Sequence, residues 1–246
     1  MRSLSTCAKE MSEQEVSNSL SGLGRLGARW EELPETVRKL LGYRFALVSK
    51  DPSFGPRGLS MSIHGLGRME ASWSRLPTAL RGSLLTSIES IAPKLNAQEI
   101  SNVLYGLGKM GVIWADLPMS IKTHLLDAFA REAWRMNSQG VANSCWGLMM
   151  LAVEWSVELN GVVRSAVWDG IRREAMNFDE QELTNVIHAL SKMEVAYTAI
   201  PLDVRSLFLQ GLAVQLPLMA PAGLVMVLVG LAKQKIEWSS MTGIVE

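Results

Sequence analysis

The sequence predicts an all-α protein, an α-solenoid (superhelix) of about six helical-hairpin repeats of 41–43 residues, and two observations carry this prediction. The segment SNSLSGLGRLG at residues 17–27 returns as SNVLYGLGKMG at residues 101–111. The leucine after the first glycine of this segment recurs at steps of 41 to 43 residues, as Leu23, Leu66, Leu107, Leu148, Leu190 and Leu231. We call these the marker leucines. A fixed period of this size is typical of stacked helical repeats.

An aromatic residue follows each marker leucine by seven positions, and in four units a proline follows the aromatic residue by four more. The aromatic residues are Trp30, Trp73, Trp114, Trp155, Tyr197 and Trp238. The prolines are Pro34, Pro77, Pro118 and Pro201. Because proline is tolerated in the first turn of a helix, we expect it to open the second helix of each hairpin. We expect the aromatic residue before it to lie in the core.

The first helix of each unit contains the marker leucine. In the third unit, apolar residues fall on one stripe at 3.6 residues per turn, which predicts that this face is buried: Ile100, Leu104, Leu107 and Met110. A cap residue followed three positions later by glutamate marks the helix start at Ser12, Asn96 and Asp179. The small residue before each marker leucine, glycine in five of six units, is expected to let neighbouring helices approach closely.

A hairpin of this length cannot bury its apolar stripe alone, so successive hairpins are expected to stack into one elongated domain. We expect an N-terminal tail over residues 1–11 and a single solenoid domain over 12–246. The predicted repeats are 12–54, 55–95, 96–136, 137–178, 179–219 and a partial repeat at 220–246. Because the sixth repeat stops before its second helix, we expect the chain to be a fragment or a truncated product.

Composition excludes several classes of protein. With 246 residues, 48% of them hydrophobic, the chain is too apolar to be wholly disordered. The 24 basic side chains balance 24 acidic ones, so any affinity for nucleic acid must come from local arrangement. Two cysteines and three widely spaced histidines predict no disulfide framework and no metal site. The uncharged segment at 211–232 is broken by two prolines, which argues against a membrane span.

Three positions of each first helix point away from the apolar stripe. They lie five before, two before and two after the marker leucine, at about 220°, 160° and 200° around the helix. We call them the outer stripe. Five before, the residues are Asn18, Met61, Asn102, Asn143, Asn185 and Met226. Two before, they are Ser21, His64, Tyr105, Trp146, His188 and Val229. Two after, they are Arg25, Arg68, Lys109, Met150, Lys192 and Lys233.

An amide, a flat ring and a cation repeated along a solenoid predict a surface for single-stranded RNA. The candidate phosphate contacts are Arg25, Arg68, Lys109, Lys192 and Lys233. The candidate base contacts are Asn18, His64, Asn102, Tyr105, Asn143, Trp146, Asn185 and His188. For the four asparagines we favour a structural role over base contact, because a repeated amide can bond the backbone of a neighbouring hairpin and so set the stacking geometry. No catalytic or phosphate-loop motif is present, so we expect binding without catalysis, cofactor or metal.

The segment at residues 101–111, with Trp114 and Leu117-Pro118, resembles the repeats of octotricopeptide-like helical-repeat proteins of organelles. It also resembles related helical-repeat proteins of mitochondrial RNA-editing substrate-binding complexes. The similarity extends over residues 12–241. The resemblance implies an RNA-binding factor located in mitochondria or, alternatively, plastids. It also implies a role in transcript processing, stability, editing, translation or ribosome assembly.

A second class of function is consistent with the same residues. A protein-binding scaffold, such as a structural subunit of an organellar ribonucleoprotein, would present adaptable apolar side chains to its partner. The zero net charge and the methionines at outer-stripe positions, Met61, Met150 and Met226, favour this alternative. The predicted partners are therefore single-stranded RNA, other ribonucleoprotein subunits, or both, and neither function involves a membrane.

Overall fold

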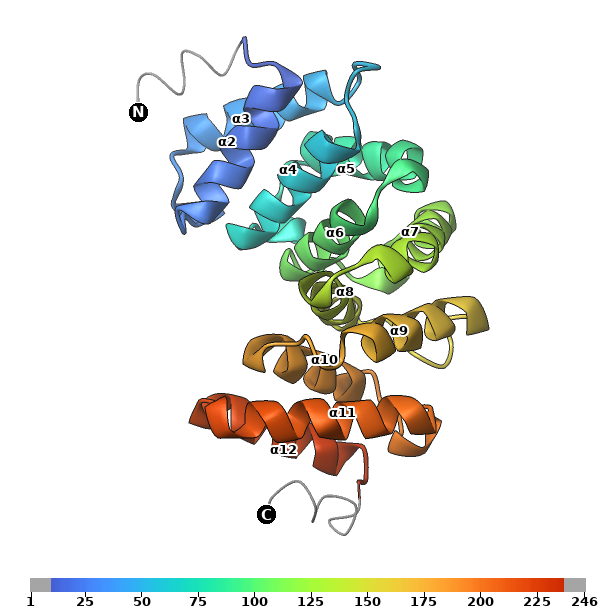
Figure 1. The fold of residues 1–246 in the computed structure, drawn as a ribbon. Coiled ribbons are helices and arrows are strands. Elements are labelled where there is room, and N and C mark those ends of the chain that lie inside the picture. The colour runs from blue at the N-terminus through green and yellow to red at the C-terminus, as the bar shows by residue number, and fades with distance from the viewer. Residues whose placement is uncertain (1–9, 237–246) are drawn as a thin grey trace.

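The computed structural model describes residues 10–236, and in this part of the chain the helices stack in chain order from one end of the molecule to the other (Figure 1). No strand occurs between residues 10 and 236. The predicted α-solenoid is confirmed. Each complete unit consists of two α-helices, and equivalent helices of successive units pack side by side in two layers.

The first helices form the more closely packed layer. They are α2 (Glu13–Arg25), α4 (Pro56–Arg68), α6 (Ala97–Lys109), α8 (Ser138–Met150), α10 (Glu180–Lys192) and α12 (Pro221–Lys233). The second helices are α3 (Glu35–Val48), α5 (Thr78–Ile91), α7 (Met119–Glu132), α9 (Gly161–Glu174) and α11 (Leu202–Gln215). Short 3-10 turns connect many of these helices, and several of the turns begin at the periodic aromatic residue.

The helix starts follow from local sequence. The capping boxes predicted at Ser12, Asn96 and Asp179 are all present. Two first helices that lack such a cap are instead capped by the preceding unit. Glu13 accepts a hydrogen bond from the backbone N–H of Gly55 at 3.2 Å. Glu180 accepts one from Ala220 at 2.6 Å. Pro34, Pro77, Pro118 and Pro201 stand at the N-cap of the second helices, one residue earlier than the first-turn position expected from the sequence.

The core is built from the predicted stripe. In α6, Ile100, Leu104 and Leu107 are completely buried and Met110 is 2% exposed, which confirms the apolar face. Trp30, Trp114 and Trp155 are buried as well, whereas Trp73 and Tyr197 are half-buried and pack against the core. Trp238 lies outside the described residues. The periodic aromatic residue therefore belongs to the core in the described units.

The periodic aromatic residues also connect neighbouring units through the backbone. In four units, their N–H donates to the carbonyl three residues after the next marker leucine. The bonds are Trp30 to Met69, Trp73 to Met110 and Trp114 to Leu151, each 2.8 Å, and Tyr197 to Gln234, 3.3 Å. The last carbonyls of a helix have no partner within the helix, so these bonds satisfy one of them in each unit.

The glycine before the marker leucine allows the first helices to touch. A Cβ added to Gly65, Gly106 or Gly147 would lie 2.6, 2.6 or 2.5 Å from a backbone atom of the preceding first helix. The expected reason for this glycine is therefore confirmed at these three positions. The glycine after the marker leucine contacts the next unit in the same way. Gly67, for example, lies against the backbone of Gly106. These regular pairings show that the first helices run parallel, each displaced in the same sense from the one before it.

The uncharged segment at 211–232 is divided in the structure. It comprises the end of α11, a 3-10 turn at Leu216–Leu218 and most of α12. Among the described residues, no helix combines the length and the apolar character needed to cross a bilayer.

Candidate functional site

The first helices line an open groove with a volume of about 980 Å³. It extends across α2, α4, α6, α8 and α10, and most of its lining is polar. The outer-stripe residues that line it are Ser21, Arg25, Met61, His64, Arg68, Asn102, Tyr105, Lys109, Asn143 and Asn185. The arrangement of parallel helices thus brings residues from five units, far apart in the sequence, onto one surface.

The remaining candidate residues occupy equivalent helix positions but do not line the groove itself. They are Asn18, Trp146, His188, Lys192 and Lys233. Asn18 is exposed on α2, and Lys192 and Lys233 are exposed at the ends of α10 and α12. The groove therefore unites eight of the thirteen predicted contact residues.

The cations form a row along the C-terminal ends of the first helices. Arg25, Arg68, Lys109, Lys192 and Lys233 each lie in the last turn of their helix. This is the end of a helix where a positive charge is favourable. Within residues 10–236, none of the five forms a salt bridge. Lys109 is half-buried and the other four are exposed. The row is interrupted in the fourth unit by Met150, which is 39% exposed.

The rings two positions before the marker leucines are half-buried and contact one another in pairs. The centroids of His64 and Tyr105 are 5.7 Å apart, with a tilt of 50° between the ring planes. Trp146 and His188 are stacked at 5.6 Å. In the described part of the chain, no ring contact joins Tyr105 to Trp146. The four rings at this position are therefore divided into two pairs.

Both histidines of these pairs have a lowered pKa. For His64 the main cause is burial, followed by the positive charges of Arg68 and Arg25. For His188 the causes are burial and the charges of Lys192 and Lys233. The pKa of each histidine is thus lowered by the cation of its own helix and by the cation of a neighbouring unit. At neutral pH both rings are uncharged, which leaves their faces suited to stacking.

These lowered pKa values predict a pH dependence of stability. The unfolded chain holds its histidine protons more tightly, with an ordinary pKa of about 6.5, so protonation favours unfolding. Above about pH 6.5 both states hold His64 and His188 uncharged, and the free energy of unfolding has its full value. As the pH falls below about 6.5, the unfolded chain takes up protons first and the free energy of unfolding decreases. We expect urea unfolding to show a lower free energy at about pH 5.5 than at about pH 7.5. The H64Q/H188Q variant should show a smaller difference. An equal difference in the variant would contradict the assignment.

The asparagines of the outer stripe are not used to hold the repeats together. Asn102, Asn143 and Asn185 are half-buried, and their side chains form no hydrogen bond with any residue from 10 to 236. The side chain of Asn18 forms none either, so the structural role favoured for the four amides is wrong: among the described residues, no neighbouring backbone group bonds to them. The donors and acceptors of Asn102, Asn143 and Asn185 face the groove.

A second row of groove residues was missed in the sequence. One helical turn before each asparagine, nine positions before the marker leucine, stand Gln98, Gln139 and Gln181, all exposed and lining the groove. Gln14 and Arg57 occupy the same position in the first and second units. These residues recur with the same period of 41 to 43 residues, but they lie nine positions before the marker leucine, outside the three positions of the outer stripe.

The two long edges of the groove differ in charge. The edge formed by the N-terminal ends of the helices contains the capping residues Glu99, Asp179 and Glu182, together with Arg57. The opposite edge contains three cations of the row, Arg25, Arg68 and Lys109. An anionic ligand is therefore drawn toward the C-terminal ends of the helices, with the amides and rings beside it.

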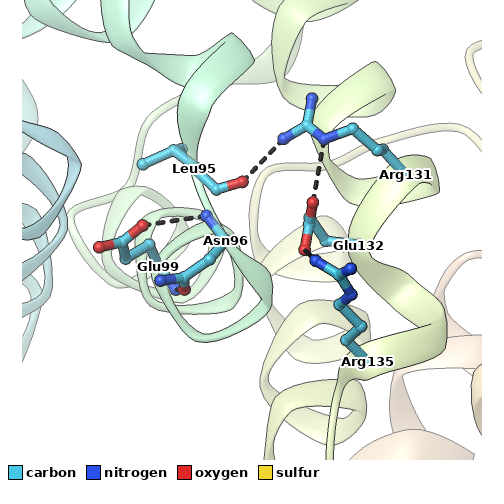
Figure 2. Close-up of polar contacts among 6 residues, drawn as sticks. All are labelled: Leu95, Asn96, Glu99, Arg131, Glu132 and Arg135. Atoms are coloured by element: carbon cyan, nitrogen blue, oxygen red, sulfur yellow. Dashed lines mark hydrogen bonds and ion pairs between the residues drawn. The ribbon is translucent and has the colours of Figure 1, made fainter.

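A smaller cavity of about 440 Å³ adjoins the groove between the third and fourth units. Figure 2 shows the charged cluster at its side. Arg131 donates to the Leu95 carbonyl at 2.7 Å and to Glu132 at 3.0 Å, and Arg135 lies 3.7 Å from the other oxygen of this buried carboxylate. In the next unit, Arg173 likewise donates to the Met136 carbonyl. The cluster therefore ties the end of a second helix to the start of its own first helix.

The described residues contain no grouping of histidine, cysteine, aspartate and glutamate that could hold a metal ion. Cys145 is buried in α8, and burial raises the pKa of its thiol to about 12. The thiol is consequently protonated at neutral pH and inert as a nucleophile. The chemistry that the groove offers is hydrogen bonding, ring stacking and attraction of negative charge.

Fold and groove together define the class of the protein: a helical-repeat α-solenoid whose surface is suited to binding an extended partner. No family model matches the sequence, and no curated protein is similar enough to indicate a relative. Among solved structures, the chain is similar to two designed armadillo repeat proteins.

The first is YIII(Dq)4CqI, with 13% identity, coverage of 86% of this chain and 87% of the other, and a TM-score of 0.31. The second is YIII(Dq.V1)4CPAF in complex with the peptide (KR)4, with 17% identity, coverage of 86% and 89%, and a TM-score of 0.28. At these TM-scores the likeness adds nothing to the assignment of function.

Proposed function

We propose that this protein binds single-stranded RNA without catalysis along the groove of its first helices. The observation that carries the proposal is the row of five cations at the C-terminal ends of the first helices, of which Arg25, Arg68 and Lys109 line the groove. None of the five forms a salt bridge with a described residue, and the groove amides form no hydrogen bond with one, so these groups are available to a phosphate and a base. Zero net charge is compatible with this function, because the acidic capping residues occupy the opposite edge.

Each kind of side chain in the groove has a partner in a single strand. In this proposal, Arg68 and Lys109 contact phosphates. Tyr105 and the neighbouring rings offer apolar faces on which bases stack, an interaction that contributes about 1–3 kcal/mol per base. Asn102 and its equivalents offer a donor and an acceptor to base edges. Binding through phosphates also releases counterions, so affinity should fall steeply as salt rises.

The test is the salt dependence of RNA affinity in a K109A/K192A variant. Each lost phosphate contact should reduce the slope of log affinity against log salt by about 0.7, or about 1.4 for both. Fluorescence anisotropy with a labelled single-stranded RNA of mixed sequence, at several salt concentrations, measures this slope.

The control is K39A/K122A, which removes the same charge from second helices. Lys39 is an exposed partner of Glu35 on α3, and Lys122 lies on α7. We expect this control to retain the affinity and slope of the unmodified protein. If K109A/K192A also retained both, the proposed phosphate contacts would be wrong.

A protein-binding scaffold is the second candidate. It is favoured by the methionines at outer-stripe positions: Met226 replaces the asparagine on α12, and Met150, which is 39% exposed, replaces the cation on α8. In this case the protein should bind no RNA at physiological salt. Location in a mitochondrion or plastid stays a prediction from the sequence resemblance.

A further inference from the structure

We infer that the third, fourth and fifth units bind three identical nucleotides in succession, and that each base is read by a glutamine and an asparagine together. The pairs are Gln98 with Asn102, Gln139 with Asn143, and Gln181 with Asn185. This inference rests on the proposed RNA binding and adds a sequence preference to it.

The two amides of each pair are neighbours on the same face of a helix. They are four residues apart, one turn of α6, α8 or α10, where side chains lie one above the other. All six amides line the groove. Between residues 10 and 236, none of the six side chains forms a hydrogen bond. Their position along the groove, without a partner among the described residues, therefore makes all six available to a ligand.

The pair is identical in three consecutive units that line the groove, although the rest of the outer stripe changes. The first unit has the same pair, Gln14 and Asn18, but neither of these residues lines the groove. After the amides come Tyr105 and Lys109 in α6, Trp146 and Met150 in α8, and His188 and Lys192 in α10. Neighbouring residues thus vary in size, charge and polarity. The amide pair alone stays constant among these positions, so the ligand groups opposite it are expected to be the same in all three units.

The second and sixth units show that the fold does not require the pair. The second unit has Arg57 and Met61 at these positions, and the sixth has Ala222 and Met226. Both helices, α4 and α12, are nevertheless 13 residues long and pack against the preceding first helix like the others. A structural explanation for three identical pairs is therefore weak.

A carboxamide has an acceptor oxygen and an N–H₂ donor side by side, which matches the adjacent donor and acceptor on a base edge. Reading one base per helical repeat with two side chains is physically feasible for a solenoid. An extended peptide also repeats donors and acceptors along its main chain. Lys109 and Lys192, which form no salt bridge with a described residue, however, favour a negatively charged ligand over a neutral peptide backbone.

The experiment compares RNAs of equal length that differ only in a central triplet: AAA, CCC, GGG, UUU, and mixed triplets of the same bases. We expect one uniform triplet to bind about fivefold or more tightly than the mixed triplets. The variants Q98A, Q139A and Q181A should each reduce this preference while leaving the salt slope unchanged. Gln210→Ala, an exposed glutamine on α11, is the matched control and should leave the preference intact.

A pair exchange makes the test specific for position. The Q139R/N143M variant gives the fourth unit the pair found in the second unit, which α4 tolerates. It should lose the preference at the middle nucleotide of the triplet and keep it at the two others. An equal loss at all three nucleotides would overturn the inference.

The possible failures are distinguishable. If the unmodified protein bound all triplets equally, the inference would be wrong while the proposed function stood. If it bound no RNA and instead bound an acidic peptide through the same six amides, both would be wrong.

Discussion

Replacement of Gly147 by alanine is expected to lower the free energy of unfolding by about 1–3 kcal/mol, the usual cost of overpacking. The added Cβ would lie 2.5 Å from the backbone carbon of Leu104 and 2.7 Å from its oxygen. Backbone atoms cannot rotate away as a side chain does, so α6 and α8 must separate. The cost therefore arises at the joint between the third and fourth units. Urea unfolding followed by circular dichroism measures it.

Gly82 provides the matched control because the same substitution there should have the opposite sign. It lies within α5, is exposed, and would have no described atom within 4 Å of an added Cβ. Alanine at an unhindered helix position is favoured over glycine by about 1 kcal/mol. Gly82→Ala should therefore stabilise the protein. A stabilising effect of Gly147→Ala would show that the helices are not held as closely as the structure places them.

The second large effect is expected for Trp114→Ala, which should lower the free energy of unfolding by about 3–5 kcal/mol. This side chain is 1% exposed, and its Nε1 donates to Glu158 of the next unit at 3.0 Å. Alanine removes the buried ring and this bond but keeps the backbone bond to Leu151. Because repeats depend on their nearest neighbours, the loss should weaken the middle of the solenoid first.

Trp73→Ala tests whether the effect comes from burial. Trp73 occupies the same repeat position and makes the same backbone bond, but its side chain is only half-buried. We expect a clearly smaller loss in the free energy of unfolding. Equal losses in the two variants would mean that the aromatic position contributes through something other than the area it buries.

The sequence was sufficient for the fold because the decisive signals are local and repeated. The apolar stripe of α6, the capping boxes and the prolines each depend on a few neighbouring residues, and the period copies them along the chain. The close approach at Gly65, Gly106 and Gly147 was also predictable, since a helix-interior glycine needs a compensating contact.

The site was predicted less completely because it depends on how units meet. Helical periodicity placed Asn102 and Lys109 on one face, but it could not show that the asparagine forms no bond to a neighbour. The pairing of Trp146 with His188, without Tyr105, depends on side-chain directions across a unit boundary. The glutamine row had the right period in the sequence, and only its place beside the groove shows that it belongs to the site.

The parallel packing of the first helices has one further consequence. In α6 and α10 the amides lie near the N-terminal end and the cation lies at the C-terminal end, and each first helix is displaced in the same sense from its predecessor. The two ends of the groove are therefore not interchangeable. If the proposed RNA binding holds, a strand inserted backwards would meet these groups in the wrong order, so we expect a single 5′-to-3′ direction of the bound strand.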